Sequence, residues 1–295
     1  MSDQQLITQI LTKVDALLPS VGSITWASTL AAVWQESRWR GGLVPAVALD
    51  DIELADLLHI DVQKDKLIAN TQQFLAGLPA NNALLWGSRG SGKSSLIHAL
   101  LNAYAADGLR LVEINREDLA SLAHLVAQLR DMDYRFIVFC DDLSFESDDA
   151  SYKALKSALE GSIFKTAANV LFYATSNRRH LVPEYASDNA DSHLVDGELH
   201  HGEAVEEKIS LSDRFGLWLS FYPLKQSAFV DVVRHWVERL AVLHAVRVDL
   251  DDPQMVKEAL RWALARGVRN GRTAQYFARH WVGAAGVRTI RQSTR

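Results

Sequence analysis

The stretch ALLWGSRGSGKS, from Ala83 to Ser94, decides the expected fold of this chain. After an apolar run of strand type, four residues separate Gly87 from Gly92, and a lysine and a serine follow directly. The next residues, SLIHALLNAYA, have a helical pattern. Because glycines let a backbone wrap around phosphate groups and a helix N-terminus attracts negative charge, the stretch predicts a strand, a phosphate-binding loop and a helix in that order.

The loop is expected to bind a nucleoside triphosphate together with Mg²⁺. The amino group of Lys93 is expected to meet the β and γ phosphates, and the hydroxyl of Ser94 to ligate Mg²⁺. The residues expected to bind the nucleotide are Gly87, Ser88, Arg89, Gly90, Ser91, Gly92, Lys93, Ser94 and Ser95.

Apolar runs of strand type alternate with helical stretches between residues 49 and 223. This alternation is typical of a parallel sheet with crossover helices, and it predicts an α/β core. Helical spacing of Leu30, Val33 and Trp34 predicts a small helical region over residues 1–48, and residues 224–295 are expected to form an all-helical C-terminal domain. The expected strands are NALLWG (82–87), LRLVEIN (109–115), RFIVFCDD (135–142), NVLFYATSN (169–177) and LWLSFYP (217–223).

Two neighbouring carboxylates end the expected strand RFIVFCDD. We expect Asp141 to hold Mg²⁺, directly or through water, and Asp142 to orient and deprotonate an attacking water. Glu146, four residues further on, is the alternative base, although an acid in a solvated loop needs no such role.

An amide ends the next expected strand, where Thr175, Ser176 and Asn177 follow an apolar run. Asn177 is expected to hydrogen-bond the γ phosphate or the attacking water. Arg178 and Arg179 come next as phosphate or partner ligands, or as surface charges in salt bridges.

Two later arginines are candidates for contact with the phosphates. Arg214 precedes the last expected strand, where its guanidinium fork would neutralise charge on a transferring phosphoryl group, or would pair with Asp213. Arg272 opens a helix in the C-terminal domain and is preferred over Arg269 as the arginine that reaches the nucleotide.

The composition is that of an ordinary globular protein. The 295 residues are 48% hydrophobic and 23% charged, with 31 basic and 36 acidic residues for a net charge of −5. These values exclude a disordered or collagen-like chain and argue against a surface that coats nucleic acid throughout. A single cysteine, Cys140, and no recognisable leader or membrane span predict a cytoplasmic protein that does not associate with membranes.

The order of these elements resembles the AAA+ P-loop ATPase superfamily, with Walker A, Walker B, sensor 1, arginine finger and a helical lid that bears sensor 2. The phrases NTQQFLAG, ANNALLWGSRGSGKSSL, RFIVFCDDLSFE, YATSNRRHLVPE, EEKISLSDRFGLWLSFYP and RNGRTA are similar to a bacterial family of AAA+ ATPases catalogued as a domain of unknown function. Walker B and sensor 1 resemble those of replication initiators and helicase loaders.

The resemblance implies ATP and Mg²⁺ as cofactors and hydrolysis between neighbouring subunits of a homo-oligomeric ring, with a hexamer favoured. It assigns Walker A to Lys93 and Ser94, sensor 1 to Asn177, the finger to Arg214 and sensor 2 to Arg272. Asp141 and Asp142 match Walker B, although Asp142 stands where a glutamate is commoner.

Several functions fit this interpretation. The first is an ATPase that remodels or assembles a protein or nucleoprotein client, although residues 115–118 lack the aromatic residue of protein-threading members. A nucleic-acid loader would use the basic residues Arg261, Arg266, Arg269, Arg272 and Arg279. A slow nucleotide-gated switch would follow from Asp142, and a small-molecule kinase is disfavoured by Arg214 and Arg272. The acidic stretch 184–208 is expected to be a mobile partner or regulatory loop rather than a metal site.

Overall fold

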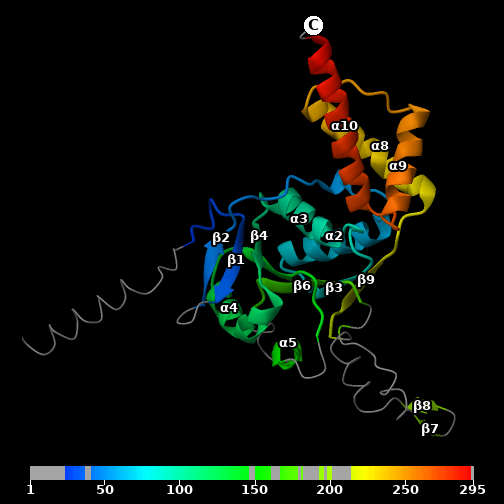
Figure 1. The fold of residues 1–295 in the computed structure, drawn as a ribbon. Coiled ribbons are helices and arrows are strands. Elements are labelled where there is room, and N and C mark those ends of the chain that lie inside the picture. Colours follow the sequence, from blue (N-terminus) through cyan, green and yellow to red (C-terminus); the bar gives the residue numbers. More distant parts are fainter. Residues whose placement is uncertain are drawn as a thin grey trace, which may run out of the picture.

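In the computed structural model, residues 24–36, 41–145, 150–160, 167–178, 181, 193–195, 198–200 and 214–293 are described. Helices cover both faces of a central sheet, and a group of three helices stands beyond one face (Figure 1). This arrangement is the three-layer α/β architecture that alternating strands and helices predict.

The central sheet has seven strands in the order β2-β1-β4-β5-β6-β3-β9. β2 is antiparallel to β1, and every other neighbouring pair is parallel. β6 therefore lies between β3 and β5, which brings the carboxyl ends of these three strands together. The strands are β1 (Ala31–Glu36), β2 (Gly41–Pro45), β3 (Ala83–Gly87), β4 (Leu109–Glu113), β5 (Arg135–Cys140), β6 (Val170–Ser176) and β9 (Leu217–Phe221).

Alternating side chains divide the interior into two cores. On β5, Ile137 and Phe139 pack into one core, while Phe136, Val138 and Cys140 pack into the other. Both faces of the strand are thus apolar, as is usual for a parallel sheet covered on both sides. The first core receives α2 (Asp61–Leu75) and α3 (Lys93–Tyr104), and the second receives η2 (Arg116–Ser121), α4 (Leu122–Leu129) and α5 (Ala150–Glu160).

The last three helices form a unit that we call the lid: α8 (Gln226–Leu243), α9 (Pro253–Ala265) and α10 (Gly271–Ser293). Phe229, Trp236 and Phe277 are buried between them and belong to the first core. A short helix, η1 (Leu54–Asp56), precedes α2 and lies against α8, because His235 Nε2 contacts Asp56 Oδ1 at 2.8 Å. The helical C-terminal domain that the sequence predicts is therefore present.

The five strands expected from the sequence are confirmed as β3, β4, β5, β6 and β9. The helical assignment is wrong for residues 31–36 and 41–45, which form β1 and β2. Trp34 is fully buried in one core and Ala31 in the other, so β1 is apolar on both faces. A short apolar run of this kind has no period that separates a strand from a buried helix.

Other expectations lie partly or wholly outside the described residues. Residues 1–23 and 37–40 of the expected N-terminal helical region lie outside the described residues, and so do Glu146 and Arg179. Within the acidic stretch, β7 (His193–Val195) pairs antiparallel with β8 (Glu198–His200). Among the described residues, no helix combines the length and the apolar character that crossing a bilayer requires.

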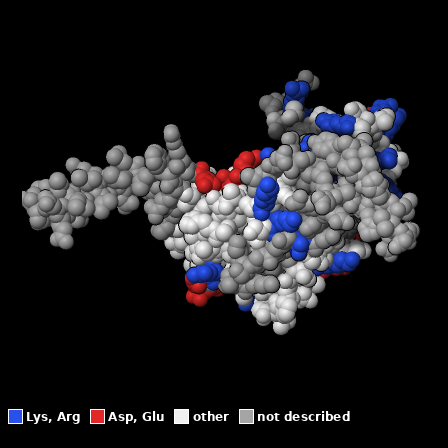
Figure 2. Space-filling model, turned by 90° about the horizontal axis from the view of Figure 1, so that it is seen from below, with Lys and Arg blue, Asp and Glu red and all other residues white. Residues whose placement is uncertain are grey.

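On the face of the molecule in Figure 2, charged side chains lie in separate groups. Figure 2 shows Lys and Arg side chains gathered in small clusters on one face, with acidic groups beside them rather than a continuous basic coat. The face in view therefore carries basic and acidic side chains in different places.

Candidate nucleotide site

Residues 87–94, which we call the phosphate loop, connect β3 to α3. Gly87, Gly90 and Gly92 have φ angles of 136°, 72° and 99°, which side-chain-bearing residues rarely adopt. A Cβ atom on Gly87 would lie 1.9 Å from the carbonyl oxygen of Phe221 on β9. Glycine is therefore required here both by the turn and by the close approach of the neighbouring strand.

Lys93 begins α3 and turns its amino group back over the phosphate loop. Its Nζ donates to the carbonyl oxygens of Gly87 and Ser88, each at 2.9 Å, and to Asn177 Oδ1 at 3.2 Å. Burial lowers the pKa of Lys93, and Asp141 and Asp142 oppose this effect by their negative charge. The ammonium group is consequently held where charged phosphates would compensate its loss of hydration.

The expected metal-holding residues are in direct contact. Ser94 Oγ donates to Asp141 Oδ1 at 2.7 Å, and the same carboxylate oxygen accepts a short hydrogen bond from Thr175 Oγ1 on β6. The hydroxyl of Thr175 also accepts from the backbone N–H of Asp142 at 3.0 Å. Thr175 thus fastens the end of β5 to the end of β6, a role that the sequence analysis did not assign.

Asp142 turns away from its neighbour. Its φ of 52° lies in the left-handed region, and its Oδ1 accepts a short hydrogen bond from Asn177 Nδ2. Arg89 Nη2 lies 3.4 Å from the other carboxylate oxygen, Oδ2. The two adjacent carboxylates therefore point to different partners across the same site.

The lid contacts the phosphate loop directly through the beginning of α10. Asn270 Nδ2 donates to the carbonyl oxygen of Arg89 at 2.7 Å, and the backbone N–H of Arg272 donates to the carbonyl oxygen of Gly90 at 3.2 Å. Asn270 Oδ1 also accepts from the N–H of Thr273 at 2.8 Å, which caps the helix. Nothing in the sequence pattern singles out Asn270, because its partner lies far away along the chain.

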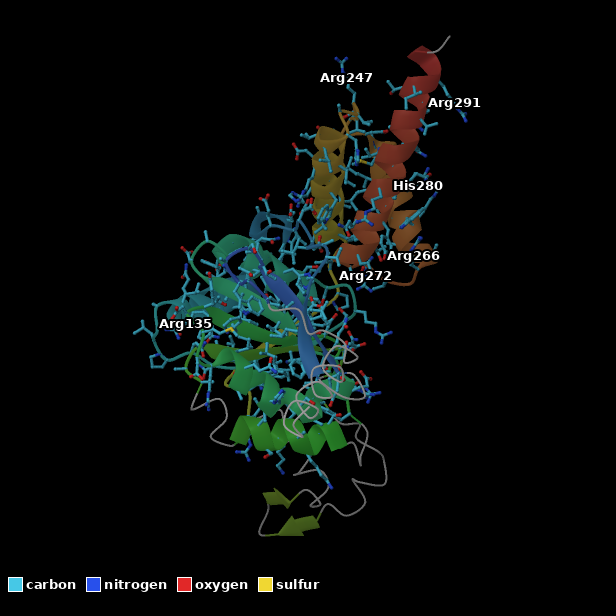
Figure 3. The ribbon with its side chains drawn as sticks, turned by 90° about the vertical axis from the view of Figure 1, so that its left-hand side faces the viewer. Arg135, Arg247, Arg266, Arg272, His280 and Arg291 are labelled. Carbon is cyan, nitrogen blue, oxygen red and sulfur yellow. The ribbon has the colours of Figure 1, made fainter. Side chains whose placement is uncertain are left out.

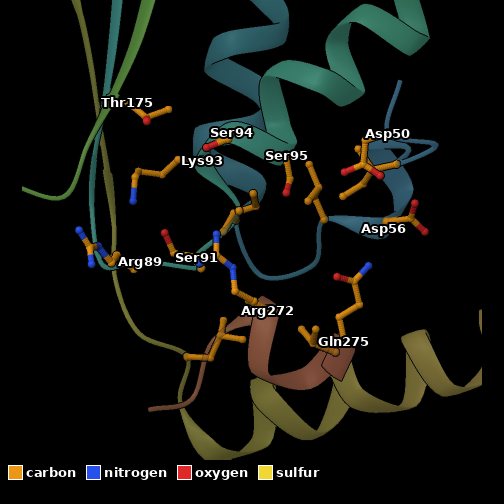
Figure 4. A pocket seen from close by; sticks show the side chains of 18 of the residues that line it. Asp50, Asp56, Arg89, Ser91, Lys93, Ser94, Ser95, Thr175, Arg272 and Gln275 are labelled. Atoms are coloured by element: carbon orange, nitrogen blue, oxygen red, sulfur yellow. The ribbon is translucent and has the colours of Figure 1, made fainter. Parts of the chain in front are cut away.

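These groups surround a cavity of about 450 Å³ between the phosphate loop, η1 and the lid (Figure 4). Side chains from α3 and from α10 approach it from opposite sides. The predicted residues that line it are Arg89, Gly90, Ser91, Gly92, Lys93, Ser94, Ser95, Asp141, Asp142, Asn177 and Arg272, whereas Gly87 and Ser88 lie outside the lining.

Apolar side chains form part of the cavity lining, and some of them lie close to the phosphate loop. Ile52, Leu57 and Ile60 line it from the segment before α2, and Val232 and Trp236 line it from α8. This apolar wall is not among the expectations from the sequence, although the apolar residues of DIELADLLHI are a signal of a buried surface there. An apolar wall beside a polar, cationic end suits a ligand with a flat base and a phosphate chain.

Other predicted residues do not reach the cavity of their own chain. Arg214 is exposed just before β9 and does not line the cavity. Arg178 is exposed and likewise lies outside the lining, and Arg269 uses its carbonyl oxygen to accept from the N–H of Leu224 at 3.0 Å. Asn177 lines the cavity and the neighbouring Arg178 does not, and Arg272 lines it whereas its alternative Arg269 does not.

The residues present fit Mg²⁺ bound together with phosphate. The Ser94 hydroxyl and an Asp141 carboxylate oxygen, 2.7 Å apart, are the oxygen donors that Mg²⁺ prefers. In the described part of the chain, no three His, Cys, Asp or Glu side chains group together as a metal cluster. Few protein ligands are normal for Mg²⁺, which usually keeps waters and binds substrate phosphates.

One known protein is similar to part of this chain in sequence. The replication factor C large subunit of Staphylothermus marinus is 32% identical over 115 residues, which make up 36% of this chain and 26% of that protein. This chain therefore corresponds to about a quarter of the length of that relative.

The Aeropyrum pernix ORC1 protein, solved in complex with DNA, has a TM-score of 0.50 at 17% identity. The match covers 76% of this chain and 61% of that one. The Thermotoga maritima RuvB Holliday junction branch migration motor matches with a TM-score of 0.43 and 14% identity over 75% of this chain and 68% of that one. At this identity, the ORC1 likeness shows the fold alone, which is that of AAA+ P-loop ATPases.

A family model described as "Protein of unknown function (DUF815)" matches residues 27–285. The match includes the sheet, the phosphate loop and almost all of the lid, so it spans both sides of the cavity. On this evidence the chain belongs to the DUF815 family and has the AAA+ P-loop ATPase fold.

Proposed function

We propose that the protein binds ATP with Mg²⁺ and hydrolyses it. The observation that carries this proposal is the meeting of Lys93, Ser94 and Asp141 with Asp142 and Asn177 at the carboxyl ends of β3, β5 and β6. Ligands of α/β sheets bind at these strand ends, where loop backbones and helix N-termini are available. The apolar residues that line the cavity from the segment before α2 and from α8 support a nucleotide rather than free phosphate.

Each residue has a separate task in this proposal. Lys93 and the backbone of the phosphate loop bind the phosphates, and Ser94 with Asp141 holds Mg²⁺. Bound Mg²⁺ would neutralise phosphate charge and align the groups for in-line displacement. Asp142 orients the attacking water and accepts its proton, while Asn177 positions Asp142 through the hydrogen bond between their side chains.

Arg214 is proposed to act on the site of a neighbouring copy in a homo-oligomeric ring, for which we favour a hexamer. Its exposure before β9, outside the cavity of its own chain, supports a role in trans. Arg272 is proposed to reach the nucleotide in cis, because it lines the cavity from α10 (Figure 4). Movement of the lid on hydrolysis would then act on a protein or nucleoprotein client.

The proposal is tested by measuring Mg²⁺-dependent ATP binding and phosphate release together. Native protein is expected to bind ATP and release phosphate, and Lys93→Ala is expected to lose both. Arg130→Ala is a suitable control, because Arg130 is exposed and does not line the cavity. Its Nε lies 3.3 Å from Oδ2 of the neighbouring Asp131. Native protein that binds no ATP would contradict the proposal.

A second candidate is a slow nucleotide-gated switch, which the shorter side chain of Asp142 favours. In that case native protein would bind ATP but release almost no phosphate, and Asp142→Glu would gain turnover. The same assay therefore separates a switch from an ATPase that turns over steadily. Phosphate transfer to a small metabolite instead of water would indicate a kinase.

Nucleic acid is a further candidate partner, favoured by the charge of the lid. From Ala259 to the end of the printed sequence there are eight arginines, no lysine and no acidic residue. In Figure 3, Arg266, His280 and Arg291 lie along the lid, whereas Arg272 lies at its base, where it lines the cavity. A guanidinium fork matches a phosphate group well, so such a surface suits a nucleic-acid backbone.

This candidate is tested by binding labelled DNA and RNA duplexes between about 50 and 200 mM salt. Contacts to phosphates predict an affinity that falls steeply with salt, with a smaller slope for Arg266→Ala and Arg291→Ala. ATP turnover that rises with added duplex would support a loader. If no duplex binds at low salt, a protein client remains the proposed partner. We propose the cytoplasm as the compartment, because the single cysteine is buried and free.

A further inference from the structure

Arg89 is the one arginine of the phosphate loop, and it lies where the loop, the end of β5 and the lid meet. Its Nη2 is 3.4 Å from Asp142 Oδ2, and its carbonyl oxygen accepts the hydrogen bond from Asn270. The side chain of Arg89 is 75% exposed, so packing does not hold the guanidinium in one position. The backbone of Arg89 is therefore held by Asn270, while its guanidinium group is able to change partner.

Asp142, the proposed base, is engaged by the chain's own donors on both carboxylate oxygens. Asn177 donates to Oδ1, and the guanidinium of Arg89 faces Oδ2. The positive φ of 52° turns the residue toward these partners and away from Ser94, which contacts Asp141 instead. A base must present an oxygen to the water that it activates, so the contact with Arg89 competes with that task.

The cavity offers Arg89 another anionic partner if the site binds a nucleoside triphosphate. Arg89 lines it beside Lys93 and Arg272, so three cations face the same space (Figure 4). The charges of Arg272 and Arg89 both act to lower the pKa of Lys93, which indicates that the three are close enough to interact. Phosphate oxygens carry more charge than a carboxylate and accept a guanidinium fork in bidentate fashion.

We propose that Arg89 exchanges partners, pairing with Asp142 in the free site and with the terminal phosphate of a bound nucleoside triphosphate, which releases Asp142 to orient water. This inference rests on the proposed ATP-binding function. It adds Arg89 as a residue that contacts the γ phosphate of the nucleotide bound to the same chain. A diphosphate lacks that phosphate, so Arg89 stays on Asp142 when ADP is bound. The loop consequently prefers ATP over ADP through Arg89.

The test measures the affinities of full-length protein for ATP and for ADP with Mg²⁺, by calorimetry. Arg89→Ala is expected to weaken ATP binding about tenfold and ADP binding about twofold or less, because only ATP loses a charge-assisted hydrogen bond. Arg89→Lys keeps the positive charge and is expected to recover part of the preference. Arg130→Ala, an exposed arginine paired with Asp131, is the matched control and should leave both affinities unchanged.

Folding is checked by thermal melts, in which an exposed side chain such as Arg89 should have little effect. An ATP-to-ADP affinity ratio that is the same in Arg89→Ala as in native protein overturns this inference and leaves the proposed ATPase function intact. Native protein that binds neither nucleotide overturns both. Equal weakening of ATP and ADP binding by Arg89→Ala also overturns it, because the contact would then not involve the terminal phosphate.

Discussion

Asp141 and Asp142 are neighbours in the chain, yet they are held in different ways. Asp141 accepts from Ser94 and Thr175, whereas Asp142 contacts Asn177 and Arg89. The turn at Asp142, with its φ of 52°, separates the two carboxylates. One is therefore suited to hold a metal ion and the other to orient water, and the two tasks should be separable by mutation.

Replacing each acid by its amide is expected to have different effects. Asp142→Asn should keep ATP affinity within about threefold and lower turnover at least about 100-fold, because the amide cannot accept a proton. Asp141→Asn should weaken the dependence of ATP affinity on Mg²⁺. Calorimetric titrations with and without Mg²⁺ and single-turnover assays check both results. Equal loss of binding in the two variants would show that the carboxylates do not have separate tasks.

Lys93 predicts a proton linkage of nucleotide binding. Its pKa lies below the ordinary value of 10.5, chiefly because of burial. Phosphates would favour the charged amine and raise that pKa, so binding should take up protons in the alkaline range where the free site has begun to lose its charge. Affinity for ATP should then fall as pH rises through this range. Calorimetry in buffers of different ionisation enthalpy would detect the uptake, and an affinity that rises toward alkaline pH would contradict it.

At the scale of elements, η1 and the lid helix α8 are joined by buried charge. Asp56 is 6% exposed, and its carboxylate contacts both His235 and Arg239 of α8. The same residue accepts from the N–H of Glu53 at 2.8 Å, which holds η1. These contacts hold η1 against α8, and both elements line the cavity.

Asp56→Ala is expected to lower the free energy of unfolding by about 3 kcal/mol, because it leaves Arg239 without its buried partner. Asp61→Ala is the matched control, since Asp61 is exposed and its pair with Lys64 at 3.2 Å should contribute less than about 1 kcal/mol. Denaturant unfolding monitored by circular dichroism checks both variants. Similar effects of the two substitutions would contradict the role assigned to Asp56.

α3 and β4 carry a contact that should depend on pH. His98 Nε2 lies 3.3 Å from Glu113 Oε1, and this interaction raises the pKa of His98 above 6.5. The stabilisation is therefore complete below pH 6.5 and is lost as pH rises through the raised value in the folded protein. Both groups are partly exposed, so the effect should stay below about 1 kcal/mol.

Melting temperatures from about pH 5.5 to 8.5 test this contact. Native protein should lose its advantage over His98→Gln as pH rises, and Glu113→Gln should show the same trend. A difference between native protein and His98→Gln that is constant with pH would contradict the linkage.

The sequence was sufficient for elements whose patterns are local. The glycine and lysine pattern predicted the phosphate loop, and apolar runs predicted the five strands of the core. The local pattern misassigns β1, because its place in the sheet depends on pairing with the distant β4. Thr175 and Asn270 could not be assigned for the same reason, since each acts on residues that only the fold brings near.

At the scale of the whole molecule, the cavity lies between the sheet with its phosphate loop and the lid. The start of α10 contacts the phosphate loop directly. The lid side of the cavity carries Arg272, its sheet side carries the two carboxylates, and Arg214 is exposed outside the cavity. An ATPase built in this way is proposed to be completed by the Arg214 of an adjoining copy. Turnover should then depend on assembly, whereas ATP binding should need only one chain.

The most direct test is ATP turnover per chain as a function of protein concentration, with light scattering on the same samples, for native protein and Arg214→Ala. Native turnover is predicted to rise cooperatively as copies assemble. Arg214→Ala is predicted to assemble and bind ATP but to hydrolyse it at least about 1,000-fold more slowly, as expected for loss of an arginine supplied in trans. Turnover per chain that is independent of concentration, with Arg214→Ala fully active, would contradict the account.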